Sequence, residues 1–317
     1  MSMESMHRLL SLSLSRRALF RLTAGAALTA ALGSGRAGAA PALRARPVPA
    51  TGEQIPVVGL GTSDAFETGP GASLGNLREV LARFYALGGR LVDTSPTYGN
   101  AEAVVGRLAA ELDLTDRLFL ATKVHEVGRA AGIAQMEASA QRLGRRRLDL
   151  IQVHNLIDVD TQLATLRRWK EEGRVRYIGI THYRVAAFDA LERLMRRVSL
   201  DFVQLNYSIA TPDAEQRLLP LARDRGIAVL VNRAFEDGYL FRAVRGRALP
   251  PWAAQFDCAS WAQFFLKYVL ADPAVTCVIP ATSKLAHLVD NMGAGVGRLP
   301  DDTATRVRMR ALIRDII

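Results

Sequence analysis

Short, continuous apolar runs alternate along the chain with segments whose apolar residues recur every three or four positions. The continuous runs are typical of strands that are buried on both faces. In the first periodic segment, Leu77, Val80, Leu81 and Phe84 follow the spacing of one helix face, and Gly88 ends the pattern. The predicted strands are residues 56–61, 90–94, 118–123, 148–154, 176–181, 202–207, 227–232 and 276–280.

These strands alternate with helical segments, for example residues 74–88, 161–173 and 185–198. Such an order places the chain in the α/β class and predicts a (β/α)8 TIM barrel over residues 55–317. An open dinucleotide-binding sheet is the alternative. No G-x-G-x-x-G motif follows an early strand, and this favours the barrel.

The first 39 residues have a different composition from the rest of the chain. Arg16 and Arg17 precede a moderately apolar segment rich in Ala, Gly and Thr, and the small residues Ala37 and Ala39 follow it. This pattern resembles a twin-arginine signal peptide. A transmembrane helix is the alternative, but the apolar run is short for that role. Residues 40–54, rich in Pro and Ala, are predicted to be a linker or N-terminal arm.

The signal resemblance predicts an exported protein, periplasmic in a bacterium with two membranes, with the twin-arginine export machinery as a partner. A cytoplasmic protein, or one tethered by an uncleaved signal, is the alternative. No stable membrane insertion of the mature chain is expected.

Composition narrows the function classes only slightly. The chain has 317 residues, of which 49% are apolar and 23% charged, as in ordinary globular proteins. The formal charge of +10 includes five Arg and one Glu in the first 39 residues, and the remaining basic residues are interleaved with acids. This distribution favours a solvated surface over a nucleic-acid interface. Cys258 and Cys277 are expected to be buried thiols.

Ionisable residues stand at the ends of consecutive predicted strands. Asp93 ends the second strand, Tyr98 follows it in the stretch LVDTSPTYGNAE, Lys123 ends the third strand and His154 the fourth. Taken singly, Asp93 fits a turn cap, Tyr98 a surface aromatic and His154 a core histidine. Because active sites of such barrels lie at the C-terminal strand ends, the four together predict a functional site.

The four residue types suit proton transfer to a carbonyl oxygen. A tyrosine has a reference pKa near 10, and a neighbouring ammonium lowers that pKa by favouring the phenolate. Lys123 is expected to act on Tyr98 in this way, with Asp93 holding the ammonium. His154 is expected to hydrogen-bond the same substrate oxygen. Paired carboxylates or metal-ligand spacings, which a hydrolase would need, do not stand out.

Motifs along residues 46–293 occur in an order that resembles the aldo-keto reductase superfamily. They are GLGT, VDTSPTYGNAE, LFLATKV, DLIQVHN, GITHY, VQLNYS and VIPATSK. The resemblance implies reversible, metal-free reduction of an aldehyde or ketone by NAD(P)H, with a catalytic tetrad of Asp93, Tyr98, Lys123 and His154. The expected partner is therefore a small-molecule carbonyl substrate.

The resemblance also implies cofactor contacts, in which this chain departs from the family pattern. Thr181-His182 replaces a Ser-Asn pair at the nicotinamide carboxamide, and Asn232 stands where an aromatic residue often stacks on the ring. Arg233 is either a pyrophosphate contact or part of a surface salt bridge. NADP(H) is weakly favoured over NAD(H), because Lys284 can offset missing basic residues at the 2′-phosphate. The full set of expected contacts is Thr181, His182, Gln204, Asn232, Arg233, Thr282, Ser283, Lys284 and Asn291.

Two further functions remain open from the sequence. One is a nucleotide-binding sensor or accessory subunit on the same fold with little turnover. The other is a different barrel enzyme, a hydrolase or isomerase that uses Asp93, Lys123 and His154.

Overall fold

The fold is described from a computed structural model that covers residues 42–69 and 71–317. The predicted export signal, residues 1–39, lies outside the described residues. The strands are β1 (Ala45–Pro47), β2 (Gln54–Pro56), β3 (Leu60–Gly61), β4 (Leu91–Asp93), β5 (Phe119–Val124), β6 (Leu148–His154), β7 (Val175–His182), β8 (Phe202–Asn206), β9 (Ala228–Asn232) and β10 (Val275–Val278).

Helices follow most of these strands along the chain, as the alternating pattern predicts. The α-helices are α1 (Gly75–Ala86), α2 (Ala101–Glu111), α3 (Arg129–Arg142), α4 (Val159–Glu171), α5 (Phe188–Arg197), α6 (Leu218–Arg225), α7 (Tyr239–Ala243), α8 (Trp261–Leu270), α9 (Leu285–Gly293) and α10 (Thr303–Arg314). Short 3-10 helices are η1 (Val185–Ala187), η2 (Asp213–Glu215) and η3 (Pro251–Phe256).

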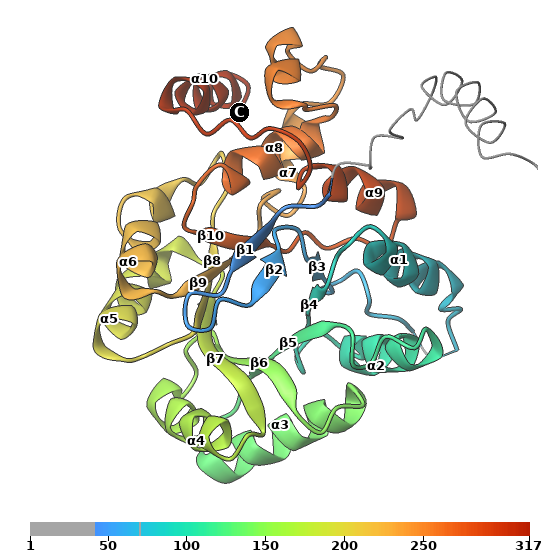
Figure 1. Cartoon of the computed structure of the whole chain (residues 1–317), viewed down its shortest axis with the longest axis vertical. Helices are drawn as coiled ribbons and strands as arrows, with labels where there is room; N and C mark the ends of the chain where they lie inside the picture. Colours follow the sequence, from blue (N-terminus) through green and yellow to red (C-terminus); the bar gives the residue numbers. More distant parts are fainter. Residues whose placement is uncertain (1–41, 70) are drawn as a thin grey trace, which may run out of the picture. The chain divides into compact units, whose positions relative to one another are not determined.

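Strands β3 to β10 form one parallel sheet of eight strands, and each pairs with the next strand in the sequence. The sheet curls so that its helices lie outside it (Figure 1). Isolated parallel bridges join Val58 to Val278 and Gly61 to Ala281. The segment around β3 therefore contacts the chain at β10. The α/β class and the eight predicted strands are confirmed, with boundaries shifted by a few residues.

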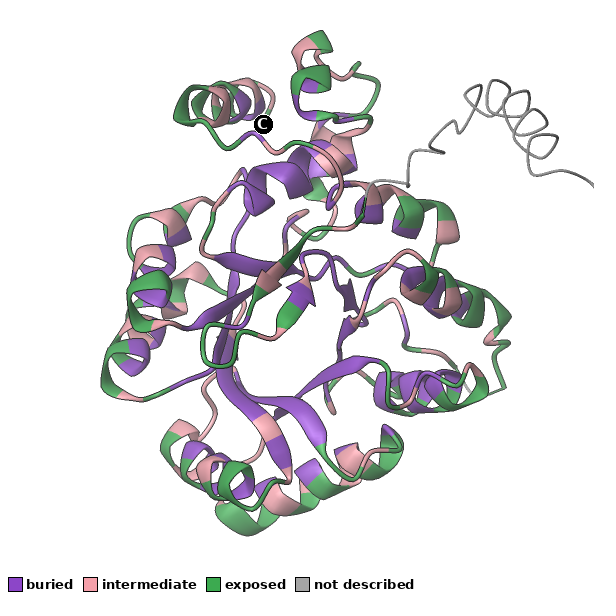
Figure 2. Cartoon of the chain, viewed as in Figure 1, coloured by how far each residue is buried: buried purple, intermediate pink, exposed green. Residues whose placement is uncertain are grey.

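The two faces of the sheet bury different sets of side chains. Along β5, Leu120 and Val124 pack in the larger apolar cluster, which contains the helix residues Val104 and Leu108. Phe119 and Ala121 face the other way and belong to a second cluster. Because side chains alternate along a strand, Lys123 shares the inner face with Phe119 and Ala121. Figure 2 shows the strands of the eight-stranded sheet almost entirely buried.

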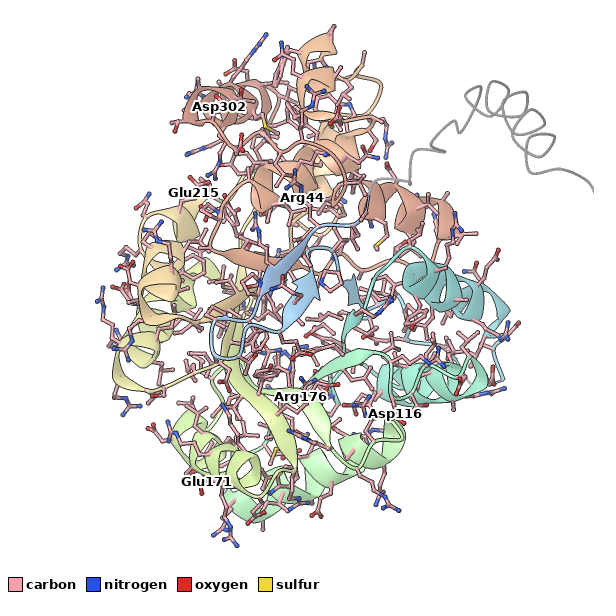
Figure 3. The ribbon with its side chains drawn as sticks, viewed as in Figure 1. Arg44, Asp116, Glu171, Arg176, Glu215 and Asp302 are labelled. Carbon is pink, nitrogen blue, oxygen red and sulfur yellow. The ribbon has the colours of Figure 1, made fainter. Side chains whose placement is uncertain are left out.

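A β-hairpin covers the end of the sheet where the strands begin. Residues 45–56 form the antiparallel pair β1–β2, although residues 40–54 were expected to be a linker or arm. Ile55 packs in the inner cluster. Arg176, labelled in Figure 3, pairs with Glu53 of the hairpin and lies 2.8 Å from Asp149. The sequence signal was missed because each strand has only three residues and three prolines lie close by.

Both cysteines are buried and free, as expected. In the part of the chain that is described, no helix is long and apolar enough to cross a membrane.

Candidate active site

The inner face of the sheet turns from apolar to polar toward the C-terminal ends of its strands. In β5 the inward sequence is Phe119, Ala121, Lys123, and in β6 it is Leu150, Gln152, His154. A side-chain period of two therefore brings polar groups from neighbouring strands together at one end of the sheet. The predicted tetrad residues lie at this end.

Lys123 is the most deeply buried member of the tetrad. Its side chain has no exposed surface, and its ammonium donates to Asp93 Oδ1 at 2.7 Å and to the Thr94 carbonyl oxygen at 2.8 Å. Burial by itself lowers the pKa of this ammonium, but the Asp93 carboxylate and then the Tyr98 phenol raise it, and the net direction is upward. Lys123 therefore stays charged inside the sheet.

Tyr98 lies beside this cation in the turn before α2. The Lys123 ammonium is 4.8 Å from the centroid of the phenol ring. Burial raises the pKa of Tyr98, Lys123 lowers it, and Asp93 raises it again. The net direction is upward, whereas the sequence argument expected a lowered pKa. Lys123 acts in the expected direction, but burial outweighs it, and the phenol keeps its proton at neutral pH.

His154 completes the group as a neutral imidazole. Its ring meets that of Tyr98 edge-on, with centroids 5.9 Å apart. Burial lowers the pKa of His154 to about 3, and the charges of Lys123, His125 and His182 add to this effect. The Nδ1 atom lies 3.2 Å from the Ser95 hydroxyl.

One of the expected cofactor residues, Gln204, is bonded directly to the tetrad, and two others are bonded to Gln204. Gln204 donates to Asp93 Oδ2 at 2.8 Å. Its carbonyl oxygen accepts from Thr181 at 3.1 Å and from Asn232 at 3.3 Å. The ends of β4, β7, β8 and β9 thus share one hydrogen-bond network on the inner face.

The other expected contacts lie further from this network. His182 is partly exposed, stacks on Tyr183 and accepts from the Arg184 backbone N–H at 3.1 Å; burial, and then the charge of Arg184, lowers the pKa of this histidine. Arg233 pairs with Asp237 at 2.7 Å, which is the salt-bridge alternative.

The segment between β10 and α9 carries the remaining residues. Thr282 accepts from the Lys284 backbone N–H at 3.1 Å, and the Ser283 carbonyl oxygen accepts from Asn76. Lys284 is exposed and immediately precedes α9, and Asn291 is buried within that helix.

Sequence reasoning missed several polar groups of the site. Ser95 and Thr97 contact His154 Nδ1, and Gln152 donates to Asp93 at 3.4 Å. A period of two from His154 would have identified Gln152, because both share the inner face. His125, two residues after Lys123, lies with its ring centroid 5.2 Å from that of His154.

Buried polar atoms without a hydrogen-bond partner gather at this end of the described structure. Such atoms are normally satisfied by protein, water or a ligand. Those near or just after the C-terminal ends of the inner-face strands are Thr94 Oγ1, His125 Nδ1, Gln152 Oε1, Asn155 Oδ1, Asn206 Oδ1, Asn232 Oδ1 and Arg233 Nε. Within residues 42–69 and 71–317, no group of three or more His, Cys, Asp or Glu side chains is arranged to hold a metal ion.

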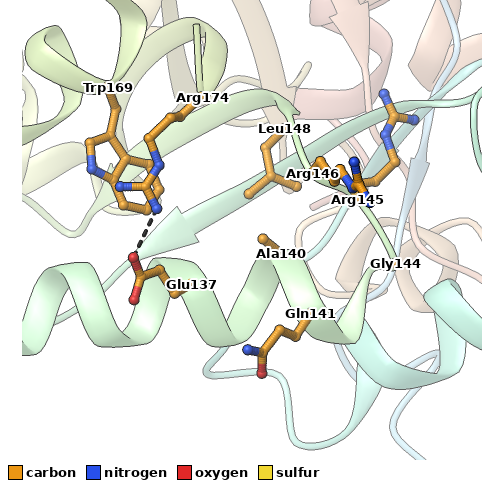
Figure 4. Close-up of a pocket in the computed structure, with 9 residues that line it drawn as sticks. All are labelled: Glu137, Ala140, Gln141, Gly144, Arg145, Arg146, Leu148, Trp169 and Arg174. Atoms are coloured by element: carbon orange, nitrogen blue, oxygen red, sulfur yellow. Dashed lines mark hydrogen bonds and ion pairs between the residues drawn. The ribbon is translucent and has the colours of Figure 1, made fainter. Parts of the chain in front are cut away.

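A hollow of about 440 Å³ lies elsewhere, beside α3 and the start of β6 (Figure 4). It is lined by Trp169 and Arg174, whose guanidinium lies 3.7 Å from the Trp169 ring centroid and 2.8 Å from Glu137. The β6 residue that lines this hollow is Leu148, which lies at the opposite end of the strand from His154. We place the candidate active site at the tetrad because the reactive groups converge there.

Comparison with known proteins shows the family of the chain. The model of the aldo/keto reductase family matches residues 57–310. An NADH-specific methylglyoxal reductase of Escherichia coli strain K12 is 28% identical over 190 residues, which cover 51% of this chain and 57% of that relative.

Solved structures share the fold. An aldo-keto reductase from Bacillus halodurans superposes with a TM-score of 0.68 at 21% identity, covering 86% of this chain and 96% of the other. An aldo/keto reductase from Klebsiella pneumoniae in complex with NADP and acetate gives a TM-score of 0.66 at 24% identity, with coverage of 83% and 93%.

Proposed function

Because the chain belongs to the aldo/keto reductase family, we propose that it reduces aldehyde or ketone carbonyls, or oxidises the corresponding alcohols, with NAD(P)H. The observation that carries this proposal is the buried Lys123 ammonium, which lies 2.7 Å from the Asp93 carboxylate and 4.8 Å from the Tyr98 ring centroid. A protonated phenol next to a fixed cation can give up its proton to a developing alkoxide.

In this mechanism Tyr98 donates its proton to the carbonyl oxygen during reduction. Lys123 stabilises the phenolate that remains, and Asp93 keeps the ammonium in place. His154 is neutral, so it can donate one hydrogen bond to the same oxygen without adding a second positive charge. Ser95 and Thr97 hold the other ring nitrogen and so orient the imidazole.

The residues present fit a nicotinamide group. A carboxamide offers two N–H donors, and Asn232 Oδ1 and Asn206 Oδ1 are buried acceptors without a partner in the described structure. Thr181, Gln204 and Asn232 would hold the carboxamide. The nicotinamide supplies the hydride when bound.

We propose NADP(H) as the preferred form. Lys284 is exposed at the start of α9, where a cation and a helix N-terminus favour phosphate. The methylglyoxal reductase relative is NADH-specific and the Klebsiella structure contains NADP, so relatives of this chain use both. Thr282, Ser283, Asn291, His182 and Arg233 complete the proposed nucleotide contacts.

The test is turnover of aldehydes and ketones, followed through NADPH and NADH absorbance, in wild type and Tyr98→Phe. Loss of the general acid should reduce kcat by about 10²- to 10⁴-fold while nucleotide binding is retained. Tyr85→Phe makes the same chemical change on α1 and should be neutral. Equal rates in wild type and Tyr98→Phe would exclude Tyr98 as the acid. Nucleotide binding by wild type without any turnover would favour a sensor or accessory subunit.

The proposal also includes closure of the sheet and export of the protein. The bridges between the β3 and β10 segments support closure of the sheet as a (β/α)8 barrel. The paired Arg16-Arg17 and the small residues Ala37 and Ala39 support export by the twin-arginine route. That route carries folded proteins, so we propose that the enzyme binds its nucleotide before export.

A further inference from the structure

Glu102 is a buried carboxylate that the proposed mechanism does not use. It lies in the first turn of α2 and is only 1% exposed. One carboxylate oxygen accepts from the Thr122 hydroxyl at 2.5 Å. The other accepts from the Ser139 hydroxyl at 3.1 Å and from the Arg142 guanidinium at 2.7 Å. Burying a carboxylate is costly unless its oxygens are satisfied, and here both are.

These bonds join the two elements that carry the proposed acid and its cation. The α2 helix begins at the Tyr98 turn, where the Ala101 N–H donates to the Tyr98 carbonyl oxygen at 2.9 Å. Thr122 immediately precedes Lys123 in β5, with its side chain on the outer face of the sheet. The Glu102 carboxylate therefore ties the base of the Tyr98 turn to the residue next to Lys123.

The α3 helix carries the other two partners of Glu102. Arg142 and Ser139 both belong to α3, and Arg142 also donates to the Ser139 hydroxyl at 3.2 Å. Gly106, one turn further along α2, lies against the Arg142 backbone so closely that a Cβ there would be 2.0 Å from its carbonyl oxygen. Glu102 thus sits in a rigid junction of α2, β5 and α3.

We infer that Glu102 is a positioning residue, which sets the placement of the Tyr98 phenol relative to the Lys123 ammonium. The inference rests on the proposed function, since it assigns Tyr98 and Lys123 the roles given there. Its effect is indirect, through backbone placement on either side of the pair.

The test compares Glu102→Gln and Thr122→Val with wild type, and Glu111→Gln is the matched control. Glu111 lies on the same helix, is exposed and pairs with Arg107 at 2.8 Å. Thr122→Val removes one hydroxyl and leaves the Glu102–Arg142 pair, so it serves if Glu102→Gln does not fold. Each protein is assayed for kcat and KM, for nucleotide affinity, and for the titration of Tyr98 by NMR of ¹³Cζ-labelled tyrosine, with Tyr98→Phe identifying the resonance.

We expect kcat of Glu102→Gln and Thr122→Val to fall about tenfold or more, because small misplacements of catalytic groups cost up to about a hundredfold. KM and nucleotide affinity should stay within about twofold, since the lost interaction acts mainly in the transition state. The Tyr98 titration should move to higher pH, because the displaced Lys123 ammonium opposes the effect of burial less strongly. Glu111→Gln should match wild type in all respects.

A loss of thermal stability with unchanged kcat per folded molecule and an unchanged Tyr98 titration would overturn the positioning role. If wild type reduces no carbonyl of the panel, the proposed function fails, and the titration still decides the inference. In that case, the same Tyr98 titration in Glu102→Gln and in wild type overturns the positioning role of Glu102. A shifted Tyr98 titration in Glu102→Gln supports that role.

Discussion

At the residue scale, the site depends on opposing effects of burial and charge on a few side chains. Burial disfavours the ammonium of Lys123, the phenolate of Tyr98 and the imidazolium of His154. Asp93 reverses this effect for Lys123 alone. The result at neutral pH is one cation, one protonated phenol and one neutral imidazole, a set that suits the proposed protonation of a carbonyl oxygen.

The pKa of His154 predicts a specific pH dependence of stability. Because its pKa falls from an ordinary 6.5 to about 3 on folding, the unfolded chain binds a proton in this range that the native chain does not. The contribution of His154 to the free energy of unfolding is complete above the pKa of the histidine in the unfolded chain. It is lost as pH falls toward the pKa in the folded chain, with a slope of about 1.4 kcal/mol per pH unit. In urea unfolding, the slope of wild type should exceed that of His154→Gln by about this amount.

His287→Gln, at an exposed site on α9, controls for the loss of a histidine. Equal slopes in wild type and His154→Gln below about pH 6 would contradict the burial argument, because the slope follows from the difference in bound protons.

At the element scale, the close approach of α2 and α3 matters more than the helix propensity of either. The two helices contact each other, α3 packs against β5, and Gly106 leaves room for the backbone of the α3 C-terminus. This contact keeps the Tyr98 turn and the end of β5 in one rigid unit. A sequence reading would treat Gly106 as a weak point in its helix, whereas the structure requires a glycine there.

Gly106→Ala should therefore destabilise the protein. Alanine favours an isolated helix by about 1 kcal/mol, but the overpacking against Arg142 is expected to cost about 1–3 kcal/mol beyond that gain. Gly75→Ala, in the exposed first turn of α1, adds a Cβ with ample space and should be neutral or stabilising. Chemical unfolding of both variants measures the difference. If Gly106→Ala were more stable than wild type, α2 and α3 could move apart at little cost in free energy, which would contradict this prediction.

At the scale of the whole molecule, the two ends of the sheet have separate roles. The hairpin β1–β2 covers the end where strands begin, and the tetrad lies where they end.

The full chain also predicts an export phenotype. Arg16→Lys with Arg17→Lys should keep the enzyme in the cytoplasm, whereas wild type should be recovered outside it with bound nucleotide, as measured by fractionation and mass spectrometry. Arg8→Lys is the matched control, because it makes the same change outside the paired motif. Export that survives the double substitution, or exported protein that neither carries nor binds nucleotide, would contradict the proposal.

The sequence by itself determined the eight-strand order and the ionisable residues at neighbouring strand ends, because apolar runs and strand-end residues are local signals. Gln204, Thr181 and Asn232 were predicted as cofactor contacts through the family resemblance, and the structure joins them in one hydrogen-bond network with Asp93. The sequence did not reveal the hairpin, whose strands are too short to form a pattern.

Only the tertiary structure decided how the charges balance. The net pKa of Tyr98 depends on how much of the phenol is buried, and the pairing of Arg233 with Asp237 depends on a turn after β9. The role of Glu102 depends on Thr122, Ser139 and Arg142, which are distant in sequence and meet only when α2, β5 and α3 pack. Burial and long-range contacts arise from the packing of the whole chain, so no local pattern encodes them.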